Sequence, residues 1–241
     1  MGSTFLSLVN RVNRKVNEVE LTSSNFASAD GFYSTAKDAV NDAISRINQD
    51  DFTWPFNHQT YNETMVAGTN RYAYQADTKY VDFSSFRIQR DASLNNETSY
   101  LKEIDYEEYL QRFVDDEYNT ATSIRGIPRL VSQRPDSGYL VYPIPDKAYT
   151  LTYEYYKLPV ELVAHGDTTT VPSQFDHIIQ EGAMVYVYDF RGDTETADRA
   201  NVRFNEKLNS MRKIYINQDD YVRDTRVFRS IGSDRMLRLN N

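Results

Sequence analysis

Apolar residues recur at helical spacing near both ends of the chain. One stripe predicts a helix from about Thr4 to Glu20, and an alanine-rich stripe predicts a second from about Asp30 to Asn48. In the C-terminal half, Ser173 is placed to cap a helix that ends at Phe190, and another helix reaches Tyr215. Because each helix has one apolar face, we expect the four to pack together, with helix two and the Gly182-Ala183 step closest.

The joint between the last two helices consists of Arg191-Gly192-Asp193. Gly192 can adopt the left-handed conformation that ends a helix, and Asp193 can cap the next one. A joint this short predicts an antiparallel helix hairpin that turns at Gly192 and Asp193.

Between the helical ends the apolar period changes to two, and glycine, asparagine and tyrosine become frequent. Short alternating runs bounded by turn residues predict antiparallel strands. These runs are 71–74, 79–83, 86–90, 130–134, 139–142 and 149–156. One amphipathic helix interrupts them near residues 103–114. The predicted fold is α+β, a four-helix bundle from both chain ends with a central antiparallel β domain, either a sandwich or barrel-like.

This pattern predicts three parts. Residues 1–57 and 172–220 would form the helical bundle domain, residues 58–171 the β domain with its helical insertion, and residues 221–241 a C-terminal tail. Directly after the second helix stand Trp54, Pro55 and Phe56. Since a helix must stop before proline, we expect these residues to lock the helix exit onto the β domain, and a ligand-stacking site is the alternative.

Composition narrows the possible functions. The chain has no cysteine, which excludes disulfides, thiolate nucleophiles and cysteine-based zinc sites. No apolar run approaches a membrane span or a signal peptide, so we expect a protein made in the cytosol that does not meet a membrane. The formal charge is −8, which argues against a general nucleic-acid binder.

The charge is uneven, because residues 221–241 carry five arginines and two aspartates, or +3, and leave −11 on the rest. A basic tail on an acidic body suggests a docking extension, and a disordered terminus is the alternative. The 19 tyrosines suit surfaces buried in an assembly, although a tyrosine-rich β core would give the same count.

Candidate catalytic residues are scarce. His177 and Glu181 stand one helical turn apart, but a lone pair is not a metal site, and no phosphate-binding loop or nucleophile elbow is present. An acidic cluster over residues 105–117 could bind a divalent cation, although a solvated helix face explains it better. Residues 191–193 have the sequence of a cell-adhesion motif, but the turn that is expected between the two helices accounts for these residues without adhesion. We therefore expect no enzyme activity, no cofactor and no metal.

The order of elements resembles a known family. A helical pair leading into Trp54-Pro-Phe-Asn57, then strands that include Tyr80-Val-Asp82, is similar to the tail adaptor, or tail tubular protein A, of short-tailed bacteriophages. The run from Tyr149 through Leu158-Pro159 and Val171-Pro172 to the helix that reaches Gly192-Asp193 resembles the same connector class.

The resemblance implies a structural virion protein at the head-to-tail junction, assembled in the host cytoplasm. Its subunits would form a ring, commonly of twelve copies, between the portal and the tail nozzle. DNA would pass through the ring without specific binding, which an acidic bore would favour.

On this view the tail docks on the portal. Apolar residues that can become ordered on a partner are interleaved with its arginines. The predicted docking residues are Arg223, Arg226, Phe228, Arg229, Arg235, Leu237 and Arg238. A nucleic-acid-binding module that uses the basic tail and a carbohydrate-binding tail protein are the alternatives.

Overall fold

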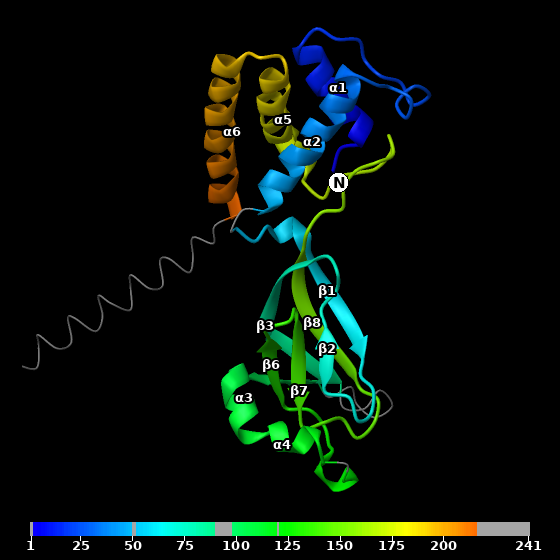
Figure 1. Ribbon diagram of the computed structural model, residues 1–241, viewed down its shortest axis with the longest axis vertical. Coiled ribbons are helices and arrows are strands. Elements are labelled where there is room, and N and C mark those ends of the chain that lie inside the picture. The colour runs from blue at the N-terminus through cyan, green and yellow to red at the C-terminus, as the bar shows by residue number, and fades with distance from the viewer. Residues whose placement is uncertain (1, 50–51, 90–97, 120, 216–241) are drawn as a thin grey trace, which may run out of the picture. The chain divides into compact units, whose positions relative to one another are not determined.

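The computed structural model describes residues 2–49, 52–89, 98–119 and 121–215. The described chain is mixed α+β, with six α-helices and two four-stranded sheets. It divides into two compact units, shown in Figure 1. The β unit comprises Met1–Leu6 and Ile44–Pro172, and the helical unit comprises Ser7–Ala43 and Ser173–Asn241. The three-part division drawn from the sequence stays a prediction, and its tail, 221–241, lies outside the described residues.

Four long helices correspond to the four predicted from the sequence: α1 (Phe5–Lys15), α2 (Phe32–Gln49), α5 (Asp176–Phe190) and α6 (Thr194–Tyr215). The first is shorter than predicted. Asn17 has a φ of 59°, and the amide of Glu18 donates to the carbonyl of Asn13. This left-handed residue ends α1 before the apolar stripe does, and Val19 is exposed.

The first turn of α5 differs from the sequence prediction. Ser173 does not cap this helix, because Ser173–Phe175 form a 3-10 turn and Phe175 occupies the cap position without a side-chain hydrogen bond. Asp176 follows and is only 1% exposed, with its carboxylate 3.0 Å from the Arg11 guanidinium. A buried carboxylate is costly unless it is paired, so this ion pair fixes α1 against the start of α5.

α5 also approaches α2 and α6 closely at Gly182. A Cβ atom at this position would lie 2.9 Å from both the Ala43 Cβ and a ring carbon of Phe204. Helix two does approach α5 at Gly182, but α6 comes equally close there, so the prediction that helix two makes the closest crossing is not confirmed. Only the absence of a side chain lets the three helices meet at this distance.

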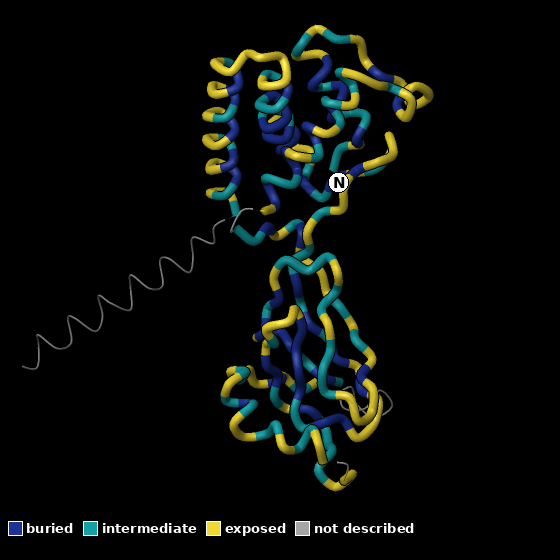
Figure 2. Tube along the Cα trace, in the orientation of Figure 1, coloured by how far each residue is buried: buried dark blue, intermediate teal, exposed yellow. Residues whose placement is uncertain are grey.

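At the turn between α5 and α6, Gly192 has a φ of 77°, and the Asp193 carboxylate accepts a hydrogen bond from the amide of Thr196 at 3.1 Å. The buried stripe of α6 runs along one side of the helix, as Figure 2 shows. It consists of Ala197, Ala200, Phe204, Leu208 and Met211. Phe190, the last residue of α5, is exposed, although helical spacing from Ile179, Ala183 and Tyr186 predicts it on the apolar stripe of this helix.

These contacts place α1, α2 and α6 around α5 within the helical unit. They do not confirm the regular four-helix bundle expected from the sequence. The described contacts establish an α5–α6 hairpin on which parts of α1 and α2 pack through Asp176 and Gly182.

The β unit contains two sheets. The first has the order β1-β8-β3-β4 and the second the order β2-β7-β6-β5. The strand bounds of the first are His58–Thr64, Thr150–Lys157, Thr78–Gln89 and Thr98–Tyr100. Those of the second are Arg71–Ala73, Gly138–Tyr142, Leu130–Arg134 and Lys102–Glu103. β5 pairs with β6 in parallel, and the other pairs are antiparallel.

The two runs 79–83 and 86–90 predicted as separate strands belong to one strand, β3. Its register with β8 shifts between Asp82 and Arg87, and the amide of Glu154 donates to the Ser85 hydroxyl within the shift. The turn-like Ser84-Ser85 step is therefore an irregularity inside a strand rather than its end.

Aromatic rings from both sheets form one core. Phe86 of β3 stacks on Tyr153 of β8 with ring centroids 4.8 Å apart, and it meets Tyr139 of β7 edge-on at 5.1 Å. Tyr139, Tyr149, Tyr153 and Tyr155 are all buried in this core. Many tyrosines thus serve the β core, which was the simpler of the two explanations for their number.

The sheets do not close into a barrel, so the barrel-like alternative is wrong. Each sheet ends in its own edge strands, β1 and β4 in one and β2 and β5 in the other. The predicted helical insertion is α3 (Tyr106–Arg112), followed by the short α4 (Val114–Glu117). Among the described helices, none has the length and apolar character needed to cross a membrane.

The close helix approach predicts that Gly182→Ala lowers the free energy of unfolding. Overpacking costs about 1–3 kcal/mol and the better helix propensity of alanine returns about 1, so we expect a net loss of up to ~2 kcal/mol. Thermal denaturation followed by circular dichroism at the helical band measures it.

The matched control is Gly166→Ala, because a Cβ there meets no atom within 4 Å. It should stay within about 0.5 kcal/mol of the wild type. Equal stability of the two variants would contradict the packing at Gly182.

Candidate functional site

Trp54 lies at the centre of an aromatic group in the β unit. Its ring is 1% exposed, stacks on Phe56 at 5.6 Å and meets Phe52 edge-on at 4.6 Å. Its indole N–H donates to the carbonyl of Ile47 at 2.8 Å, and Pro55 begins the short 3-10 helix that follows. A ring this deeply buried offers no open face to a ligand, which favours the expected lock over the ligand-stacking alternative.

A buried polar network surrounds this group. Asn57 donates to the Asn48 side chain at 2.5 Å and accepts from the Thr170 hydroxyl at 2.8 Å. The Lys79 ammonium donates to the carbonyls of Asn48 and Phe52 at 2.6 and 3.1 Å. The last turn of α2 is thereby bound to β3 and to the segment before α5. The sequence pattern indicated a role for the aromatic residues but not for the asparagine pair, because an asparagine near the end of a helix usually takes part in a turn.

A second network fixes the helical insertion onto the second sheet. The Glu117 carboxylate accepts hydrogen bonds from Tyr109 at 2.7 Å, Asn70 at 2.9 Å and Arg71 at 2.7 Å, and its side chain is 12% exposed. Burial would raise the pKa of Glu117, but the bonds from Arg71, Tyr109 and Asn70 outweigh burial and lower it.

The candidate metal ligands from the sequence have other partners. Glu181 binds Arg203 and Lys207 rather than His177, whose Nδ1 lies 3.1 Å from the carbonyl of Gln174. In the acidic cluster, Asp116 accepts from Tyr142. The described residues contain no group of three or more carboxylate or imidazole side chains that could hold a metal ion.

The adhesion-like tripeptide is likewise engaged within the helical unit. The Arg191 guanidinium pairs with Glu18 at 2.7 Å and lies 4.9 Å from the centre of the Phe32 ring. Its side chain therefore has structural partners.

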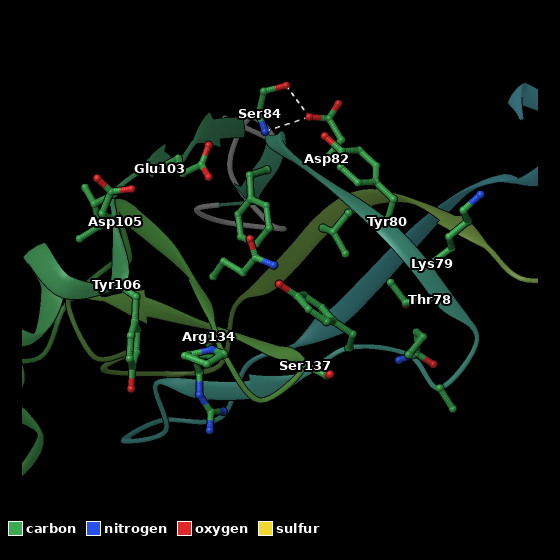
Figure 3. Close-up of a pocket in the computed structure, with 18 residues that line it drawn as sticks. Thr78, Lys79, Tyr80, Asp82, Ser84, Glu103, Asp105, Tyr106, Arg134 and Ser137 are labelled. Atoms are coloured by element: carbon green, nitrogen blue, oxygen red, sulfur yellow. Dashed lines mark hydrogen bonds between the residues drawn. The ribbon is translucent and has the colours of Figure 1, made fainter. Parts of the chain in front are cut away.

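The β unit has an open groove of about 1060 Å³, drawn in Figure 3. One wall is the first half of β3, residues 78–84, and the other is the end of β6 with its turn, 133–137. β4 pairs only with residues 87–89 of β3, and β5 pairs only with Leu130 and Val131 of β6. In the part of the chain that the structure describes, both walls are thus strand edges without a partner strand on the groove side.

Apolar residues are also exposed on the segment that follows β8. Val160 and Val163 are 78% and 76% exposed, and Leu158 is partly exposed beside them. This segment belongs to the β unit. Exposed apolar side chains in a row are typical of surfaces that another protein covers.

The predicted docking residues of the tail, Arg223 to Arg238, lie outside the described residues. Their role stays a prediction, as do the roles assigned to the Trp54 group and to the turn at Gly192 and Asp193.

The asparagine network predicts that Asn57→Ala destabilises the β unit by about 1–3 kcal/mol, because it leaves the buried Asn48 and the half-buried Thr170 side chains without these bonds. Trp54 is the only tryptophan in the chain, so its fluorescence during urea unfolding reports on this site directly. The control is Asn62→Ala, whose side chain meets Thr152 at an exposed position. The network would be unimportant if both variants unfolded at the same urea concentration.

The Glu117 network predicts a stability difference that depends on pH. Because the folded pKa lies below the ordinary glutamate value of about 4.3, the contribution of Glu117 is complete above that value. It is lost as the pH falls through the folded pKa. Glu117→Gln, which does not titrate, should therefore cost about 1–2 kcal/mol at pH 7 and progressively less in acid.

Urea unfolding at a series of pH values measures this difference. Glu107→Gln, on the exposed side of α3, is the control and should change little at any pH. A constant difference between wild type and Glu117→Gln from pH 7 to pH 3 would contradict the assignment.

Comparison with known proteins places the chain in a family. A search among curated proteins found no match. Residues 3–230, which cover most of both units, match the family model described as SU10 adaptor protein. The resemblance to phage tail adaptors drawn from the sequence is thereby confirmed. The chain belongs to the SU10 adaptor family, whose members are structural adaptor proteins of short-tailed-phage type.

Proposed function

We propose that this protein is a head-to-tail adaptor that forms a ring between the portal and the tail nozzle and surrounds the DNA exit channel. The observation that supports this most is the family match, which runs through both units from residue 3 to residue 230. Membership makes the protein a structural component of a phage particle. The position in the particle, the ring, commonly of twelve copies in the resembling family, and its assembly in the host cytoplasm are the finer parts of the proposal.

Ring formation needs two different surfaces on each subunit that meet each other. The described surface offers apolar side chains in several places, including Val160 and Val163 of the β unit and, on α6 of the helical unit, Val202. These are candidates for contacts between neighbours, because assembly would remove them from water.

The charge distribution fits a conduit for DNA. Outside residues 221–241 the chain carries a formal charge of −11. An acidic lining gains nothing from counterion release when DNA passes, so the DNA can slide without being held. A bore that is neutral or basic in the assembled ring would remove this part of the proposal.

The tail is assigned to the portal. Its arginines and apolar residues are interleaved from Arg223 to Arg238, and a segment of this kind becomes ordered on a partner surface at an entropic cost that the contacts must exceed. Removal of the chain after Asp220 is expected to leave a folded protein that no longer joins purified portal rings. Light scattering coupled to size-exclusion chromatography measures the mass with and without the portal.

A full-length variant with Arg223, Arg226 and Arg229 changed to glutamate tests the same point without shortening the chain. We expect at least a ~10-fold loss of portal binding for both variants. Circular dichroism is the folding control, since every described helix and strand ends before residue 216. Normal joining to portals by either variant would rule out tail docking.

The same samples separate the alternative functions. A nucleic-acid-binding module would retain DNA on a filter at low salt and lose it steeply as salt rises. A carbohydrate-binding tail protein would bind glycans as a free subunit. Either result without portal-dependent assembly would replace the adaptor proposal for this chain.

A further inference from the structure

We propose that the groove of the β unit binds the arginine-bearing tail of this chain, residues 221–241, as an added strand along β3. This goes beyond the adaptor role, and it concerns subunits that have not yet joined a portal.

The backbone of the groove is suited to receive an extended segment. Residues Thr78–Asp82 of β3 pair with β8 on one side and, among the described residues, with no strand on the other. Facing them across the groove, Gln133 and Arg134 of β6 have no strand on that side either. An open strand edge presents a row of backbone donors and acceptors that an incoming peptide can pair with.

Side-chain atoms in the walls also lack hydrogen bonds. The Tyr74 hydroxyl, the Thr78 hydroxyl and the Nε of Arg134 are buried and have no hydrogen-bond partner in the described structure. Unpaired buried polar atoms are uncommon in native proteins, and a peptide backbone in the groove could pair with these once their side chains turn toward it.

The net charge of the side chains that line the groove is negative. Asp82, Glu103 and Asp105 follow one another along one rim in Figure 3. Asp136 neutralises the Arg134 guanidinium, and the Lys79 ammonium, which keeps its charge while it donates to the carbonyls of Asn48 and Phe52, is outnumbered by the three carboxylates. A basic segment is therefore the occupant that the rim favours.

An aromatic ring adds a second mode of contact. Tyr80 stands on β3 at the groove and is 52% exposed. A guanidinium or a phenyl ring of an incoming segment can stack on its face.

The tail has the chemistry that this groove requires. It carries five arginines against two aspartates, whereas the rest of the chain is acidic. Its run Thr225-Arg-Val-Phe-Arg-Ser-Ile231 is rich in β-branched and aromatic residues and contains two of the five arginines. No other occupant needs to be supplied, because every subunit brings this segment with it.

Docking in the groove and docking on the portal exclude each other, since one tail cannot occupy both places. The groove would hold the tail, and cover an open strand edge, until the portal takes it. Open edges invite pairing with other chains, so this arrangement would also protect free subunits from aggregation.

The chain without cysteines permits a direct test in the full-length protein. Ser84→Cys places a thiol on the exposed rim of β3, and Ser230→Cys places one in the tail. On mild oxidation we expect a disulfide to form at least ~10-fold faster than in the control pair Ser123→Cys with Ser230→Cys, because docking raises the local concentration of the tail thiol. Ser123 is exposed in the same unit and does not line the groove.

Non-reducing gel electrophoresis shows whether the tail in the groove belongs to the same subunit or to a neighbouring one. A faster-migrating monomer means that a subunit holds its own tail, and a dimer means that it holds the tail of a neighbour. Changing Arg226 and Arg229 to glutamate, outside the described fold, should reduce the rate to that of the control pair. The combined change Glu103→Gln and Asp105→Asn should slow it as well.

Equal rates for the two thiol pairs would overturn the proposal, and so would rates that the arginine changes leave unaltered. The measurement needs no portal. It therefore gives the same result whether or not subunits assemble into a ring, and failure of the adaptor proposal would be seen separately in the portal-binding experiment.

Discussion

The packing of aromatic rings between two unclosed sheets is the constraint on which the β unit depends. Phe86, Tyr139 and Tyr153 meet at centroid distances between 4.8 and 5.6 Å and come from both sheets. Rings of this size fill the space between two layers, and each buries a large apolar area. Because β4 and β5 pair with only part of β3 and β6, the rest of these two strands keeps an open edge among the described residues, and the groove lies between them.

Polar contacts then connect this core to the segments that flank it. Lys79 of β3 and Asn57 hold the end of α2, while Glu117 holds the helical insertion. Each is a buried or half-buried group whose partners come from distant parts of the sequence. Such networks stabilise only one arrangement, because a missing partner leaves a costly unpaired group. A rigid β unit of this kind suits a structural adaptor, since a part that joins two larger assemblies must keep its shape.

The packing of the helices in the helical unit depends on a small residue rather than on a large one. Gly182 allows α5 to approach both α2 and α6, and the pair of Arg11 with Asp176 adds α1. The surface of α6 opposite its buried stripe remains mostly polar, with Val202 exposed. Such a surface stays soluble in a free subunit and still offers an apolar contact to a neighbour.

The sequence by itself determined the class of fold and the family. Helical stripes such as Ala197 to Met211 and alternating runs such as Tyr149 to Tyr156 depend on local periodicity, which the chain carries in every short window. The turn residues between α5 and α6 are local in the same way. The predictions from local sequence were wrong where the same residues are compatible with two different structures. Ser84-Ser85 resembled a turn but lies within β3, and Ser173 resembled a cap but precedes a 3-10 turn.

Only the tertiary structure decided which edges stay open and which polar groups meet. Thr170 lies far in sequence from Asn48 and Asn57, and no pattern links Glu117 to Arg71 and Asn70. Sheet order, and with it the groove beside β3, follows from long-range pairing between strands that contain nearly interchangeable residues. Local periodicity specifies how each segment can be buried, but the choice of partner is made by packing among all of them at once.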